Sequence, residues 1–468
     1  MGCCQSEPSA KASGEEVEEE VIFPGCWIPE TEMRGITLLQ LAEVLKKLKK
    51  SAEAWLASGG PKAGQAIPAE EINLYDTTQY IILPATAPFK CSYVELVAKS
   101  PQRRPIFFVS HWWGEAVSLF YRCLEQHGED RMLAQDAPYW VCAYANNQHS
   151  LGAAVTNNPT ESSFYKALCL VEGVISVVDA EGMVFTRVWC VFEVFHALMG
   201  NLKSDFKWDV YTAHDHHYCG DTRHAVGIVD GLAYHNINNQ KSGNKEYPGF
   251  KIMRESHFPV NLLSKSVTLC LEAGQATVEA DRKHILNSMV GRKDSQLDEE
   301  PLRTHSNYQK ANDVVRGRLA NATFDVGLQQ DDDVFKSYLN ALSRSGVKNL
   351  FVRIPENVAK ERHDQFVDAL PTSLETVVIG GLVSVPESLG KLTSLKSLNL
   401  SGLRATNLPE SVGNMLELEV IILNHCESLI SLPNAMLKLA KLKHLELKDC
   451  KSLKDIPDFS KELRVQRT

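Results

Sequence analysis

The segments 105-PIFFVSHWWGE-115 and 174-VISVVDAEGMVFTRVWCVFEVFHAL-198 decide how the central part of this chain folds. Each opens with a short apolar run, typical of a buried strand, and continues into polar residues and a helical pattern. Between them lie another apolar run, YWVCAY at 139–144, and a helix-like segment at 161–173. Strands that alternate with helices predict an α/β domain built on a parallel sheet.

Polar residues follow each predicted strand, at the points where the strands end. Ligands bind outside the carboxyl ends of the strands in open parallel sheets, so we expect these side chains to converge on one rim. A glutamate near arginine, asparagine and aromatic side chains predicts a site for a ribose, a base and an anionic group. Alternatively, the tryptophans are packing anchors, and the helix dipole favours the glutamate in the first turn of its helix. The candidate residues are Ser110, His111, Trp112, Trp113, Asn146, Asn147, Asp179, Arg187 and Glu193.

The order of these elements resembles a divergent TIR (Toll/interleukin-1 receptor) domain over residues 103–215. The segment 186-TRVWCVFEVFHAL-198 is similar to the S-x-W-C-x-x-E-L segment of such domains, and FVSHWWGE (108–115) stands in the place of their first strand. The resemblance implies a flavodoxin-like, TIR-like parallel-sheet domain with helical extensions. TIR domains that cleave NAD use the glutamate of this segment as the catalytic residue and oligomerise to complete the site. Here the resemblance implies Glu193 as the catalytic residue, NAD as the substrate, and a homo-oligomer.

A second pattern is a repeat in the C-terminal part of the chain. The sequence L-x-x-L-x-L recurs at 374–379, 395–400, 418–423 and 442–447, each time followed by an apolar residue and a proline. A fixed period with fixed apolar positions is the signature of leucine-rich repeats, in which each repeat contributes one strand. The pattern resembles the short repeats of intracellular plant and Ras-associated proteins, and predicts an α/β leucine-rich-repeat solenoid over 346–468.

Residues between the recurring leucines are expected on the concave face of such an array. Val420 and Ile422, on the same side of one expected strand, form a small apolar spot within a charged rim, as a protein-binding face would. The alternative is a solvated sheet without a partner. We expect a protein partner at Lys396, Asn399, Val420, Ile422, His444 and Glu446.

The N-terminal sequence MGCCQS matches the pattern for N-myristoylation at Gly2, with Cys3 and Cys4 beside it as candidate palmitoylation sites. One myristoyl chain gives only marginal membrane binding, so a second signal is needed. The acidic run at 15–20 would be repelled by anionic lipid, which leaves the cysteines as that signal. We therefore expect residues 1–30 to tether the protein to the cytoplasmic face of a membrane.

The composition excludes several classes of protein. A net charge of −9 argues against nucleic-acid binding, which needs a basic face. The twelve cysteines are scattered without a CxxC pair, and are typical of reduced thiols in an intracellular protein. No apolar run is long enough to span a membrane.

The remaining segments divide the chain further. Residues 36–58 predict an amphipathic helix within an N-terminal extension at 31–102, and 73–86 predict extended structure. The TIR-like domain with C-terminal helices is placed at 103–290, followed by a linker and helical segment at 291–345. The cluster 214-HDHHYC-219 is interpreted as a polar loop rather than a metal site, and 235–250 as a Gly/Asn-rich loop.

Together these patterns predict a membrane-anchored intracellular signalling or adaptor protein, in which the repeats bind a partner and the TIR-like domain assembles or signals. The alternative is an NAD-cleaving hydrolase that uses Glu193 and is regulated by the repeats.

Overall fold

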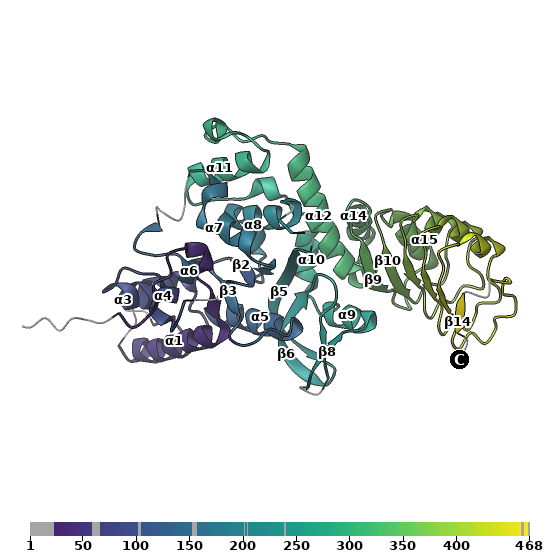
Figure 1. Ribbon diagram of the computed structural model, residues 1–468, viewed down its shortest axis with the longest axis horizontal. Helices are drawn as coiled ribbons and strands as arrows, with labels where there is room; N and C mark the ends of the chain where they lie inside the picture. Colours follow the sequence, from purple (N-terminus) through teal and green to yellow (C-terminus); the bar gives the residue numbers. More distant parts are fainter. Residues whose placement is uncertain are drawn as a thin grey trace, which may run out of the picture.

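The structure is a computed structural model that describes residues 23–58, 66–101, 104–151, 157–200, 202–203, 205–237, 240–459 and 463–466. Within these residues, two six-stranded sheets lie side by side, one in the N-terminal half of the chain and one in the repeats (Figure 1). The predicted lipidation sites Gly2, Cys3 and Cys4 lie outside the described residues. No helix in the described part of the chain is long and apolar enough to cross a membrane.

The first sheet has the order β1-β3-β2-β4-β5-β6. Strands β3, β2, β4 and β5 run parallel, while the edge strands β1 and β6 are antiparallel to their neighbours. The parallel centre confirms the predicted α/β organisation. The strands are β1 (Ile36–Thr37), β2 (Phe107–His111), β3 (Pro138–Trp140), β4 (Gly173–Val177), β5 (Lys207–Tyr218) and β6 (Asp221–Ile228).

Helices cover both faces of this sheet. Alternate residues of a strand point to opposite faces, so Val109 packs in one core with α1 and α5, while Phe108 packs in another with α8. The helices are α1 (Leu38–Ser58), α2 (Leu74–Thr77), α3 (Leu83–Thr86), α4 (Tyr93–Val97), α5 (Val117–Asp130), α6 (Cys142–Ala145), α7 (Ser163–Leu170), α8 (Val188–Met199), α9 (Pro248–Glu255), α10 (Val260–Ser266), α11 (Glu279–Met289), α12 (Ser306–Ala322), α13 (Phe324–Gly327), α14 (Asp332–Ser343) and α15 (Lys360–Ala369).

A fully buried carboxylate, Asp209 on β5, holds the amino-terminal side of the sheet together. It accepts hydrogen bonds from His127 Nε2 (3.1 Å), from Arg131 Nε and Nη2 (2.8 and 2.6 Å) and from the backbone N–H of Asp230 (2.8 Å). Burial alone would raise the pKa of Asp209, but Arg131 and His127 hold it well below its ordinary value. Asp230 in turn pairs with Arg318 of α12 at 2.8 Å, so the network reaches the helix that leads to the repeats.

The second sheet is built from the repeats, with the strands in parallel and in sequence order. Thr376, Ser397, Val420, His444 and Arg464 stand side by side along it, one from each successive strand. This arrangement confirms the predicted leucine-rich repeats. The strands are β9 (Asn349–Arg353), β10 (Thr376–Gly380), β11 (Ser397–Asn399), β12 (Val420–Ile422), β13 (His444–Glu446) and β14 (Arg464–Gln466).

Short 3₁₀ segments stack behind these strands. They are η8 (Glu387–Lys391), η9 (Glu410–Asn414) and η10 (Asn434–Lys438). The stacking requires glycine, because a Cβ on Gly390 or on Gly413 would lie 2.5 Å from atoms of the following segment. The third segment has Leu437 at the corresponding position, and this side chain is 53% exposed.

Helices α12 and α14 join the two sheets (Figure 1). Their apolar residues, such as Leu319 and Phe335, belong to one continuous hydrophobic core that includes Phe108 of the first sheet and Leu350 of the second. The repeats are therefore packed against the α/β region and are not merely tethered to it.

Two predicted extended segments differ in the structure. Residues 73–86 are helical and not extended, because the Asn73 side chain and the Asp76 side chain cap each other's backbone at the start of α2. A π-helical turn, η2 (Thr78–Ile82), and α3 continue from there. The strand predicted at 139–144 ends at Trp140, and α6 begins at Cys142.

Two predicted loops are strands. Residues up to Tyr218 continue β5, with His216 and Tyr218 buried and His217 exposed between them, which is the alternation of a strand. Residues 235–250 begin with a hairpin formed by β7 (Tyr234–Ile237) and β8 (Gln240–Lys245), before α9 starts. The polar composition of both segments concealed these pairings.

Candidate functional site

Two predicted site residues, Ser110 and Glu193, come together behind the carboxyl end of β2. Ser110 is fully buried, on the same face of the sheet as Phe108, and Glu193 is only 4% exposed on the helix α8 that covers this face. Neither Ser110 Oγ nor Glu193 Oε2 forms a hydrogen bond of ordinary geometry with a described residue, although the Ser110 hydroxyl lies close enough to Glu193 to lower the pKa of that carboxyl. Unpartnered buried polar atoms are costly, so their presence indicates a site that a ligand or water completes.

The Glu193 carboxyl is electrostatically unusual. Burial raises its pKa to about 8, and the neighbouring Ser110 hydroxyl opposes this shift only in part. The side chain is therefore mostly neutral at pH 7 in this conformation. A strongly shifted carboxyl at the carboxyl edge of a parallel sheet marks a candidate functional residue.

His111 and Glu115, on the side of the sheet that α5 covers, also carry buried polar atoms without partners among the described residues. The ring of His111 lies 4.9 Å from that of Phe120 on α5, and its Nδ1 contacts the Val109 carbonyl at 3.2 Å. His111 Nε2 and Glu115 Oε2 have no partner in the described part of the chain. Burial lowers the pKa of His111 to about 4, while burial and then the charge of Asp179 raise the pKa of Glu115 to about 8.

The two predicted tryptophans are engaged in packing. Trp113 donates its indole N–H to Cys142 Sγ at 3.2 Å, and its ring lies 5.5 Å from that of Tyr75. The ring of Trp112 lies against Gly114, where a Cβ would come within 2.1 Å of it. Gly114 is therefore required by this close approach.

The remaining predicted residues of this site already have partners. The buried Asn146 accepts a hydrogen bond from Ser163 Oγ at 2.9 Å. Arg187 donates to Thr277 Oγ1 at 3.2 Å. Asn146 and Arg187 therefore lie near the carboxyl edge of the sheet, but these hydrogen bonds do not involve Ser110 or Glu193.

Sequence reasoning did not select three residues that belong to this edge. Glu115 ends the HWWGE segment, and its position just beyond a strand was an available signal. Cys142 and Tyr144, whose buried hydroxyl also has no partner among the described residues, lie in the segment wrongly predicted as a strand.

On the repeats, the predicted protein-binding residues fall into two rows. Asn399, Ile422 and Glu446 stand next to one another across β11, β12 and β13, and Val420 stands next to His444. Lys396 lies just before β11 and pairs with Glu375 at 2.7 Å.

Charges beside these rows are paired with one another. Glu375 also pairs with Lys348 at 2.9 Å, and Glu419 pairs with Lys443 at 2.6 Å. Because these exposed charges pair with one another, the apolar residues Val420 and Ile422 are the part of this face best suited to contact a partner.

The exposed face of the repeat strands continues into a cleft between the two sheets. This cleft has a volume of about 580 Å³ and is lined by Phe351 of β9, Trp208 of β5 and Arg318 of α12. Phe351 is the register neighbour of Val378 on β10, so one row of side chains runs from the cleft onto the repeats.

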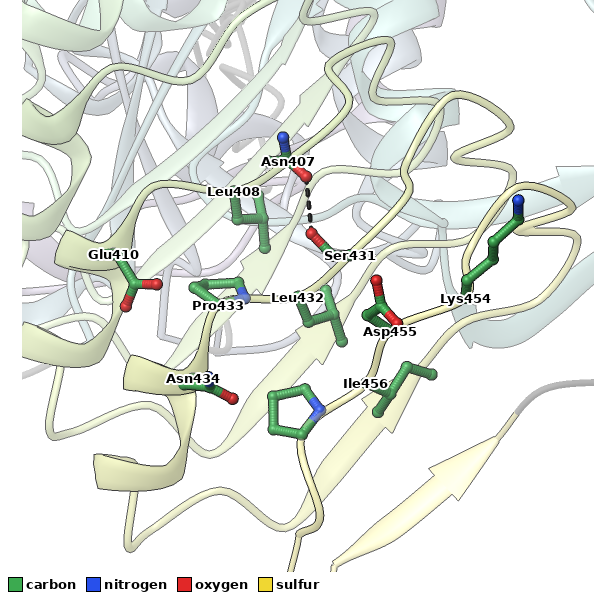
Figure 2. Close-up of a pocket in the computed structure, with 11 residues that line it drawn as sticks. Asn407, Leu408, Glu410, Ser431, Leu432, Pro433, Asn434, Lys454, Asp455 and Ile456 are labelled. Atoms are coloured by element: carbon green, nitrogen blue, oxygen red, sulfur yellow. Dashed lines mark hydrogen bonds between the residues drawn. The ribbon is translucent and has the colours of Figure 1, made fainter.

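A separate groove of about 530 Å³ lies between the strands and the 3₁₀ segments, along residues 407–410, 431–434 and 454–457 (Figure 2). Its floor is formed by the apolar residues before the repeat prolines, Leu408, Leu432 and Ile456. Ser431 donates a hydrogen bond to Asn407 Oδ1 at 2.8 Å across it. The sequence carried a signal for this groove, because the apolar-proline pairs recur with the repeat.

The end of β5 is rich in histidine, a residue type that binds metal ions. Among the described residues, no group of three or more His, Cys, Asp or Glu side chains is placed to hold a metal ion.

Comparisons with known proteins concern only part of the chain. No model of a known protein family matches it. Over 90 residues, 19% of this chain, it is 33% identical to a putative disease resistance protein and 31% identical to the disease resistance protein RPS4B, both of Arabidopsis thaliana. The match covers 8% of the length of each relative.

Two solved structures are similar in part. One is a leucine-rich repeat protein of Leptospira interrogans, at 18% identity over 27% of this chain and 40% of that chain, with a TM-score of 0.19. The other is the leucine-rich repeat domain of the type III effector XopL, at 14% identity over 40% of this chain and 90% of that chain, with a TM-score of 0.13.

The raised pKa of Glu193 predicts a pH-dependent stability. Between the unfolded pKa, about 4.3, and the raised folded pKa, the folded state keeps the proton that the unfolded state releases. The folded state is therefore most stable, as far as this group is concerned, below the unfolded pKa, and it loses stability as the pH rises to the folded pKa. Glu193→Gln, which imitates the neutral acid, should not lose stability in this way. The free energy of unfolding of the variant minus that of the wild type should therefore increase by more than about 1 kcal/mol between about pH 5 and about pH 8.

Urea unfolding across this pH range measures the effect. Glu53→Gln, at an exposed position on α1, serves as the control and should follow the wild type. A profile for Glu193→Gln that runs parallel to the wild type would contradict the assignment.

Proposed function

We propose that this chain is a peripheral membrane signalling protein in which the leucine-rich repeats bind a protein partner and a TIR-like α/β domain responds. The observation that carries the proposal is the continuity between the concave face and the cleft at Phe351. A partner seated along this row contacts both the repeats and the first sheet. The disease resistance proteins that share part of the sequence support a role in defence signalling.

The TIR-like part of the proposal is supported by topology. Numbered along the chain, the four parallel strands have the spatial order 2-1-3-4, which is the order of flavodoxin-like sheets. Glu193 lies on the helix that follows the third of these strands. Assembly of this domain into a homo-oligomer is the signalling step that we propose.

Membrane attachment is proposed from the sequence of the N-terminus alone. Gly2 would carry a myristoyl chain, and Cys3 and Cys4 would carry the second acyl signal. This places the repeats and the α/β domain at the cytoplasmic face of a membrane, where local concentration favours assembly.

The concave face can be tested by placing a charge within it. Ile422→Glu should weaken capture of the partner about 30-fold, because a buried apolar contact at the centre of an interface contributes about 2 kcal/mol. Affinity purification from source cells with quantitative mass spectrometry measures this. Leu437→Glu, which also replaces a branched aliphatic residue by glutamate but at an exposed position of η10, is the matched control and should retain the partner. Equal capture by the two variants would remove the concave face from the proposal.

Gly2→Ala tests the anchor. The variant cannot be myristoylated and should move from the membrane fraction to the cytosolic fraction of source cells. Replacing Cys3 and Cys4 by serine leaves the myristoyl chain, whose membrane association constant is only on the order of 10⁴ M⁻¹, and should give partial release. Full retention of Gly2→Ala on membranes would refute acylation as the anchor.

NAD cleavage is a second candidate function, favoured by the unpartnered Glu193 and Ser110. In this reaction, the bond between nicotinamide and the ribose C1′ breaks, water adds to C1′, and nicotinamide, ADP-ribose and a proton are released. An ionised Glu193 would stabilise the positive charge that develops on the ribose, as carboxylates do at oxocarbenium-like centres.

Clustered protein on beads should therefore release nicotinamide from NAD, and Glu193→Gln should reduce the rate by at least about 100-fold. Chromatography of the products measures the rate. If clustered wild type releases none, NAD cleavage is excluded as the function of this site under these conditions. Equal release by both proteins would exclude Glu193 from the reaction.

A further inference from the structure

The N-terminal extension is bound to the loop that follows β2. Leu74 donates its backbone N–H to the Trp113 carbonyl, and Val117 donates to the Ile72 carbonyl, each at 2.9 Å. Between these bonds, Asn73 and Ala116 form an antiparallel bridge. The ring of Tyr75 then lies over Trp113.

The same extension is bound to the loop that follows β3. Thr86 Oγ1 contacts His149 Nε2 at 2.9 Å, and the Asn147 amide donates to the Lys90 carbonyl. Farther along, the ring of Tyr93 lies 5.8 Å from the ring of Tyr144. One segment, residues 72–93, therefore spans both loops at the carboxyl edge of the first sheet.

Buried polar atoms without partners of ordinary hydrogen-bond geometry among the described residues lie at the same edge of the sheet. They belong to Ser110, Tyr144 and Glu193, each no more than 4% exposed. Cys190 lies with them, since the charge of Glu193 and the hydroxyl of Ser110 both act on its thiol. Trp113 connects the segment to these atoms, because its ring lies beside Tyr75 and its indole N–H donates to Cys142 Sγ, on whose thiol the charge of Glu193 acts.

The covering segment also contains an irregular backbone. The π-helical turn η2 interrupts the helices between α2 and α3, and the buried Thr78 hydroxyl within it has no partner in the described part of the chain. Such turns occur frequently at functional sites. The apolar side chains of Ile72, Leu74 and Ile82 hold the segment down, because all three are buried.

We infer that residues 72–93 form a lid over the carboxyl edge of the first sheet, and that a ligand reaches Ser110 and Glu193 only when Tyr75 separates from Trp113. Opening breaks the two backbone hydrogen bonds at Leu74 and Val117 and exposes the site. The inference concerns access to the site and does not depend on the chemistry proposed above.

Thiol labelling of the full chain tests the lid. Cys190 lies beside Glu193, so its rate of alkylation by a small maleimide reports opening, whereas the buried Cys123 on α5 reports general loosening of the fold. Tyr75→Ala removes the contact with Trp113 and should speed labelling of Cys190 about tenfold, with Cys123 unchanged. Tyr247→Ala removes an aromatic side chain that is 74% exposed at the start of α9, and should change neither rate.

A second variant locks the lid. Cysteines at the bridged positions, Asn73→Cys with Ala116→Cys, are adjacent across an antiparallel pair, a geometry that suits a disulfide. Oxidised before labelling, this variant should slow alkylation of Cys190 below the wild-type rate. Equal acceleration of Cys123 and Cys190 by Tyr75→Ala, an unchanged Cys190 rate in that variant, or no slowing in the locked variant would each overturn the lid.

Discussion

The buried carboxylate of Asp209 is the electrostatic constraint on which the first sheet and its connection to α12 depend. A charge removed from water must be matched by donors, and four hydrogen bonds from α5 and from the residues after β6 supply them. Removing one partner of such a pair typically costs about 3–5 kcal/mol, because the other charge stays buried. The network continues through Asp230 to Arg318, so the amino edge of the first sheet also positions α12 and the repeats.

Much of the fold was predictable because its signals are local. The repeat leucines recur at a fixed period, and the apolar runs at β2 and β4 are short and bounded by polar residues. Residues 73–86 were predicted wrongly because their helical start depends on mutual capping between Asn73 and Asp76, which outweighs the extended tendency of the sequence. The end of β5 was predicted wrongly because its histidines pair with β6, which follows it along the chain.

The candidate site was predictable only in part for a related reason. Ser110 and Glu193 were identified, but their closeness depends on how α8 packs across the sheet. Cys142 and Tyr144 were missed because α6 begins where a strand was expected. Asn146 and Arg187 were also selected, yet the sequence gives no sign that Ser163 and Thr277 already engage them.

Burial links the lid to the ionisation of the site. In the conformation described, Glu193 and Glu115 are desolvated, and burial raises the pKa of each carboxyl to about 8. Water that enters on opening would favour their charged forms. In the proposed NAD reaction, the closed conformation therefore holds Glu193 in its inactive, protonated state, and access and charge change together.

The position occupied by Leu437 bears on how this repeat array evolves. Gly390 and Gly413 let each 3₁₀ segment receive the next, whereas η10 carries Leu437 at the same position, with its side chain 53% exposed. A copy of either glycine-bearing repeat would therefore stack without a change to its own sequence. A copy of the repeat that carries Leu437 would need a small residue in place of the leucine before another segment could pack equally close behind it.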